Sequence, residues 1–151
     1  MKKLFRTFIA VAVIGSIATL ASCTKTCDEG FEGDKCDVEI RAKFFGTYSA
    51  SQTKNGGAAT TSVATITTST ANINTINISN LPNNFFSSSV KATVTGTAFT
   101  IASQDPDNDN YIITGTGALT GTTITITYTV TGDDGTGTNV TDSYITTLTP
   151  Q

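Results

Sequence analysis

Apolar and polar residues alternate along most of the chain after residue 44. The segment Ile124–Val130 (ITITYTV) alternates without a break, and Val90–Thr95 (VKATVT) does the same. Successive side chains of a β-strand point to opposite faces, so this period of two predicts strands with one buried face and one wet face. Threonine suits the wet face, because its branched Cβ favours extended backbone while its hydroxyl stays in contact with water.

The pattern predicts about eight strands, separated by short turn sequences such as Gly96-Thr97 and Thr120-Gly121. Gaps of this length are typical of hairpins, so neighbouring strands are expected to pair antiparallel. Asn80–Phe86 is the one stretch with room for a short turn of helix. The expected strands lie near residues 44–51, 60–69, 71–80, 88–95, 98–102, 110–119, 122–131 and 141–149.

Few charged residues fall within these strands. Lys54 and Lys91 are the basic residues of the region, and Asp142 is the acidic residue nearest to a strand. Exposed sheet edges are normally protected by charge, proline or closure, so the sheet is expected to close on itself. The predicted fold class is therefore all-β, an antiparallel meander that forms a barrel over residues 44–151. A sandwich with covered edges is the alternative.

The N-terminus has a different composition. Lys2, Lys3 and Arg6 precede an apolar run from Phe8 to Leu20. That run is short for a membrane-spanning helix, which needs about 20 residues, and fits a cleaved signal helix over residues 1–22 better than a transmembrane anchor.

Leu20-Ala21-Ser22-Cys23 resembles the lipobox of bacterial lipoproteins. The resemblance implies that Cys23 becomes the lipidated first residue of the mature protein. Several acyl chains on one residue hold a protein stably on a membrane. The chain has three cysteines, and lipidation of Cys23 leaves Cys27 and Cys36 to form a disulfide in an oxidising compartment.

The segment Cys27–Cys36 (CDEGFEGDKC) resembles the last loop of an EGF-like module, without the cysteines of the earlier loops. Residues 23–43 are thus expected to form a disulfide-looped spacer between the membrane and the barrel. A recognition loop is the alternative interpretation, although so small a loop has little apolar surface to bury.

The order of these segments, followed by Phe44–Tyr48 (FFGTY), resembles small Bacteroidota surface lipoproteins that carry a lipocalin-like β-domain. The resemblance implies a lipid-anchored protein of the outer membrane, on its periplasmic face or at the cell surface. Lipocalins have Gly-x-Trp on the first strand, and Tyr48 stands at the position of that tryptophan.

The residue inventory argues against catalysis. The chain has no histidine, which removes the commonest general base, and no serine has an obvious activating partner. We expect neither enzymatic activity nor a cofactor. Three of the nine Lys and Arg residues lie before Cys23, which leaves six against twelve Asp and Glu. This acidic balance excludes nucleic acid as an expected partner.

Two groups of residues remain as candidate sites. Asp105, Asp107 and Asp109 alternate as oxygen ligands of calcium do, although a solvated turn explains the same composition. Phe85, Phe86 and Tyr48 are the candidate ligand contacts, and the two phenylalanines fit equally a plug that folds into one end of the barrel.

Two functional hypotheses follow. In the first, the barrel binds a small apolar molecule, since an eight-stranded barrel is wide enough either to be filled by side chains or to hold one small ligand. The small residues Ala92, Gly115 and Gly117 would leave room for it. In the second, the protein is a structural or adhesive envelope module that contacts glycans or proteins through its outer surface.

Overall fold

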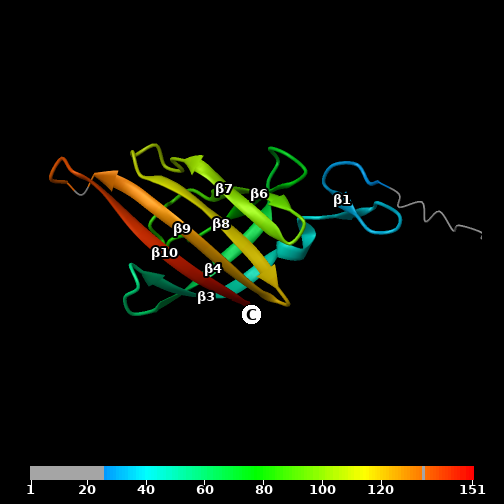
Figure 1. The fold of residues 1–151 in the computed structure, drawn as a ribbon, viewed down its shortest axis with the longest axis horizontal. Helices are drawn as coiled ribbons and strands as arrows, with labels where there is room; N and C mark the ends of the chain where they lie inside the picture. The colour runs from blue at the N-terminus through cyan, green and yellow to red at the C-terminus, as the bar shows by residue number, and fades with distance from the viewer. Residues whose placement is uncertain (1–25, 134) are drawn as a thin grey trace, which may run out of the picture.

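A closed β-barrel makes up most of the computed structural model, which describes residues 26–133 and 135–151 (Figure 1). Eight antiparallel strands follow one another around the barrel, and the last pairs with the first. This confirms the predicted fold class and decides for the barrel over the sandwich. The strands are β3 (Gly46–Lys54), β4 (Thr60–Thr68), β5 (Thr75–Ile78), β6 (Val90–Thr95), β7 (Ala98–Gln104), β8 (Ile112–Thr120), β9 (Thr123–Asp133) and β10 (Asn139–Pro150).

Several of the expected strands begin later than the sequence pattern predicts, and β3 and β5 show why. Ala42–Phe44 form a short 3-10 helix, η1, so β3 starts at Gly46 and not at residue 44. Strand β5 is confined to Thr75–Ile78, because the preceding residues form the turn after β4. The stretch Asn80–Phe86 contains turns and no helix.

The alternation places the apolar residues inside the barrel. On β9, Ile124, Ile126, Tyr128 and Val130 are all buried. Pairing between strands carries this inward face around the barrel, with one register shift between Ile101 and Gln104 in the β7–β8 pair, and the core is a single cluster of buried hydrophobic residues. No helix in the described part of the chain is long and apolar enough to cross a membrane.

A small module precedes the barrel. Strands β1 (Phe31–Glu32) and β2 (Val38–Glu39) pair antiparallel within it, and Cys27 and Cys36 form the expected disulfide, with an S–S distance of 2.08 Å. We call residues 27–40 the cysteine module and the barrel end next to it the proximal end. The predicted signal segment 1–22 and the predicted lipidation site Cys23 lie outside the described residues.

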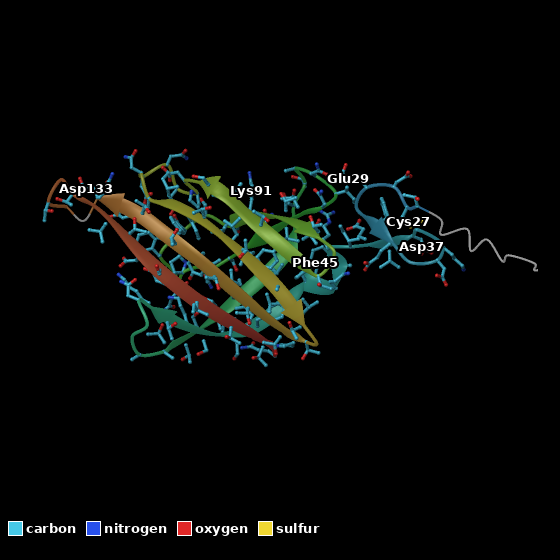
Figure 2. The ribbon with its side chains drawn as sticks, in the orientation of Figure 1. Cys27, Glu29, Asp37, Phe45, Lys91 and Asp133 are labelled. Atoms are coloured by element: carbon cyan, nitrogen blue, oxygen red, sulfur yellow. A yellow bond between two sulfur atoms is a disulfide. The ribbon has the colours of Figure 1, made fainter. Side chains whose placement is uncertain are left out.

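The cysteine module is docked on the turn between β4 and β5. Gly30 is buried with φ +88°, and a side chain there would collide with Ile73. Asn74 donates a hydrogen bond to Glu29 at 3.0 Å, and Lys43 forms an ion pair with Glu32 at 2.8 Å. The spacer predicted from sequence therefore packs against the barrel. Figure 2 shows it beyond Phe45, at the opposite end of the long axis from Asp133.

Candidate functional site

The two ends of the barrel differ in how they are closed. Phe44 of η1 is fully buried at the proximal end and meets the ring of Phe99 edge to face, with 5.5 Å between centroids. The Tyr48 hydroxyl donates to the Phe44 carbonyl at 2.8 Å, and burial raises the pKa of this hydroxyl. Tyr48 thus helps to close the proximal end, in line with the floor position that the lipocalin resemblance assigns to it.

The interior between the two ends is filled by side chains. The glycines that the sequence pattern places inside the barrel do not leave empty space, because atoms of neighbouring strands occupy it. A Cβ atom at Gly117 would collide with the ring of Phe99, and one at Gly115 would collide with Tyr128. At Gly115 and Gly117 the barrel therefore has no room for a ligand.

Room exists at the end opposite the cysteine module, where a cavity of about 390 Å³ opens to solvent. We call it the distal mouth. It lies among the ends of β3, β8, β9 and β10 and beside the loop between β5 and β6. Its walls are Lys54, Phe85, Tyr111, Val130, Gly132, Val140, Asp142 and Tyr144.

One wall of the distal mouth is aromatic. Phe85 packs edge to face on Tyr111, with 5.0 Å between ring centroids, and on the buried Phe86 at the same distance. Tyr111 lies over Gly132, where a Cβ atom would collide with the ring, and its hydroxyl donates to the Asp133 carbonyl at 2.7 Å. The wall is thus fixed, although Phe85 itself is 47% exposed.

Another part of the wall carries an ion pair. Lys54 and Asp142 contact each other at 2.7 Å, and Asp142 also accepts a hydrogen bond from the side-chain Nδ2 of Asn55 at 2.8 Å. The hydrogen bond between the two side chains raises the pKa of Lys54 and lowers the pKa of Asp142, so both groups are charged at neutral pH. The Lys54 ammonium also lies 6.0 Å from the centroid of the Tyr144 ring.

A stacked pair of tyrosines and a buried polar cluster support this wall. Tyr144 stacks on Tyr128 with 5.1 Å between centroids and 6° between planes. The Tyr128 hydroxyl donates to the Gln52 side chain at 2.7 Å and lies 3.2 Å from the Thr146 hydroxyl. Burial raises the pKa of Tyr128, so it stays protonated and its hydrogen bonds hold the ring in place.

The structure separates the ligand contacts that the sequence suggested. Phe85 lines the distal mouth, Phe86 is buried behind it, and Tyr48 lies at the proximal end beside another groove. The two interpretations of the phenylalanine pair therefore apply to one residue each: Phe86 is directed into the barrel and Phe85 is left partly exposed.

The three aspartates of the calcium hypothesis serve as hydrogen-bond acceptors in the turn between β7 and β8. Asp105 accepts from the Asp109 and Asn110 amides, and Asp109 accepts from the Tyr111 amide. Asp107 reaches across to the β5–β6 loop, where it accepts from the Ser87 and Ser88 amides at 2.7 Å each. Among the described residues, no group of three or more acidic, cysteine or histidine side chains is arranged to hold a metal ion.

Sequence reasoning missed Lys54 and Asp142 as partners in a site. The two residues are 88 positions apart and meet only because the last strand pairs with the first. A signal for them exists: Lys54 continues the inward parity of Tyr48, Ala50 and Gln52 on β3. A charged residue that continues an inward-facing pattern at a strand end belongs at the mouth of a barrel.

Comparisons with known proteins support the architecture. No family model matches the chain, and no curated protein matches it. Among solved structures, it is similar to a chain described as "Structure of EF1p2_mFAP2b bound to DFHBI". The TM-score is 0.53 and the identity 18%, over 74% of this chain and 98% of the other. This likeness shows that the fold is a closed β-barrel of the general lipocalin-like type, and that the same architecture occurs in a protein bound to DFHBI.

Proposed function

We propose that this protein is a non-catalytic, lipid-anchored module of the cell envelope that binds a small, largely apolar molecule in the distal mouth. One observation carries the proposal: a cavity of about 390 Å³ with partly exposed apolar side chains at its rim. Ligand sites are typically concave, mostly apolar, about 300–1,000 Å³ in volume and supplied with a few polar groups. The distal mouth has each of these properties.

Exposed apolar residues at the distal mouth need a physical reason. Phe85 is 47% exposed and Val140 41% exposed, and both line the same cavity. Burial of apolar surface contributes roughly 25 cal/mol per Å², so a molecule that covers these side chains gains binding free energy from a rim that water otherwise wets. The similar chain described as bound to DFHBI supports the use of this architecture for binding a ligand.

The placement of the mouth also fits a membrane anchor. The cysteine module and Asp133 lie at opposite ends of the long axis (Figure 2), and the lipobox-like sequence that ends at Cys23 precedes the module. A protein held by Cys23 would present its distal mouth away from the lipid surface. The resemblance to Bacteroidota surface lipoproteins supports the outer membrane as its location.

A second candidate function is glycan contact through the outer wall. Thr93, Thr100, Thr116 and Thr127 are exposed and face one another in register across β6 to β9, beside a shallow groove of about 350 Å³. Such a row offers evenly spaced hydroxyl groups to a polysaccharide. Binding of a glycan that Thr116→Val weakens, with the mouth variants below unaffected, would favour this function.

A titration with an uncharged apolar probe tests ligand binding in the distal mouth. The chain has four tyrosines and no tryptophan, and Tyr111 and Tyr144 line the cavity, so tyrosine fluorescence reports on it. We expect a saturable change when cyclohexylmethanol is added to the full chain in phospholipid nanodiscs, after subtraction of empty nanodiscs. Val140→Gln should weaken binding by about fivefold, because a polar group replaces apolar rim surface.

Ile145→Gln is the matched control. Ile145 is a β-branched residue of the same strand, 52% exposed, but it does not line the cavity. We expect this variant to bind as the original chain does. Equal loss in both variants, or no saturable change with any apolar probe, would overturn the proposal.

A further inference from the structure

Asp142 is the fixed partner of the ion pair in the distal mouth. One of its carboxylate oxygens accepts a hydrogen bond from the side-chain Nδ2 of Asn55 at 2.8 Å, and the other contacts Lys54 at 2.7 Å. Asn55 is fixed in turn, because its side-chain oxygen accepts from the Ser143 amide at 2.8 Å. The carboxylate is thus held by the β3–β4 turn and by its own strand, independently of Lys54.

Lys54 is the exchangeable partner. Its side chain is 54% exposed, against 24% for that of Asp142, and it stands at the last position of β3. A lysine stem is flexible and its ammonium is readily hydrated, so Lys54 can turn into solvent without leaving a buried charge behind. Ion pairs between exposed groups hold together weakly, by about 0–1 kcal/mol.

The charges around the distal mouth favour a cation. In the described parts of the loops at this end, the charged residues are carboxylates: Asp105, Asp107 and Asp109 between β7 and β8, and Asp133 at the end of β9. Their hydrogen bonds to backbone amides leave the negative charge in place. Lys54 and Lys91 are the cations at the strand ends here, and Asp142 balances Lys54, so the carboxylates remain in excess and attract ligands of the opposite sign.

We infer that the ligand of the distal mouth is an organic cation, an ammonium group on a compact apolar body, which replaces Lys54 on Asp142. The inference rests on the proposed function and names its ligand class. The apolar body would cover Phe85 and Val140, and the ammonium would lie against Asp142 near the face of Tyr144. An aromatic face attracts a cation, and a carboxylate beside it adds a charge-assisted hydrogen bond.

An anionic ligand fits the same geometry poorly. It would have to bind Lys54 in competition with Asp142, and the carboxylate cannot turn away as freely because Asn55 also holds it. The loop carboxylates would oppose its approach as well. The Lys54 ammonium thus occupies the place that the ligand's own ammonium would take.

A matched series of probes tests the charge preference. We expect cyclohexylmethylamine to bind about tenfold more tightly than cyclohexylmethanol, and cyclohexanecarboxylate to bind most weakly, with tyrosine fluorescence as the readout. Asp142→Asn should abolish the difference between amine and alcohol. Asp37→Asn makes the same charge change in the cysteine module and should preserve the preference.

Lys54→Met provides an independent variant in which the resident cation is absent. The amine should then bind about threefold to tenfold more tightly, because it no longer competes with Lys54. If the alcohol binds as well as the amine, or if Lys54→Met weakens the amine, the inference is wrong while ligand binding stands. If no probe binds saturably, the proposed function itself fails.

Discussion

The proximal and distal ends of this barrel are built from the same kind of strand, but the proximal end is closed by buried side chains and the distal end is open to solvent. At the proximal end, η1 inserts Phe44 into the core, and Arg41 is buried with its guanidinium 2.8–2.9 Å from three backbone carbonyls. At the distal end, Phe85 and Val140 stay partly exposed around a cavity, and the charged pair Lys54–Asp142 stands among them.

The difference indicates that one end of the barrel contributes most to the stability of the fold, while the other end is available to contact a ligand. Closing one end with an apolar plug and a buried arginine removes the need to fill the other end completely. The distal end can then carry polar groups and exposed rings, which would destabilise the protein if both ends had to be built that way. The proximal end also adjoins the cysteine module (Figure 1), which packs against it through Gly30, Glu29 and Glu32.

The comparison is tested most strongly by truncating one phenylalanine at each end. Phe44 is fully buried, so Phe44→Ala should lower the free energy of unfolding by about 3–5 kcal/mol. Phe85 is 47% exposed, so Phe85→Ala should cost less than about 1.5 kcal/mol while it weakens ligand binding at the distal mouth. Urea unfolding followed by circular dichroism measures both. Equal losses of stability would show that the ends do not differ in this way.

The buried arginine gives the next largest effect. Arg41→Met keeps a long side chain but removes the guanidinium that joins the Ser69, Asn72 and Thr75 carbonyls, although the Asn72 and Thr75 carbonyls each keep one backbone amide donor. Because hydrogen bonds from a charged group contribute more than neutral ones, the free energy of unfolding should fall by about 2–3 kcal/mol.

Lys43→Met is the control for Arg41→Met. Lys43 pairs with Glu32 at a more exposed position, so its loss should cost less than about 1 kcal/mol. Amide hydrogen exchange in residues 69–75 should speed up in the Arg41 variant alone. Unchanged exchange there would contradict the role assigned to the guanidinium.

Much of the barrel was predictable because strand alternation is a local property. Each predicted strand corresponds to a strand of the structure, because a segment such as Ile124–Val130 needs only its own alternation to define an inward face. Closure was predictable from the lack of charged residues along the strands. The start of β3 was not, because nothing local distinguishes Phe44 in η1 from the first residue of a strand.

The site was less predictable, because it depends on contacts between distant parts of the chain. Gly115 and Gly117 suggested free interior space, but Tyr128 and Phe99 from neighbouring strands occupy it. Arg41 gave no sign of burial, since arginines are mostly exposed and its partners are backbone carbonyls from another loop. Phe85 was singled out because clustered aromatic residues in a turn-rich segment need either a pocket or a partner; it lines the distal mouth, and its contact with a ligand stays a prediction.

The smallest expected effect concerns the loop that carries Phe85. The Ser87 and Ser88 amides and the Ser87 hydroxyl donate hydrogen bonds to Asp107, which holds the pKa of this carboxyl below its usual value of 3.8. A lowered pKa means that the ionised carboxylate stabilises the folded loop above the ordinary pKa, and that this contribution is lost as the pH falls through the lower value. The Ser87 and Ser88 amide proton shifts should therefore titrate together with a midpoint below 3.8.

Asp107→Asn removes that titration and keeps a side chain of the same shape with fewer acceptor sites. The β5–β6 loop should then open more often, and a ligand in the distal mouth should bind slightly more weakly, since Phe85 lies two residues from Ser87. The unfolding midpoint should hardly change, because the loop is exposed and the proximal plug is untouched. A midpoint at or above 3.8 in the original chain, or full ligand affinity in the variant, would mean that Asp107 does not position the aromatic wall. The distal end would then owe its shape to ring packing on Tyr111 alone.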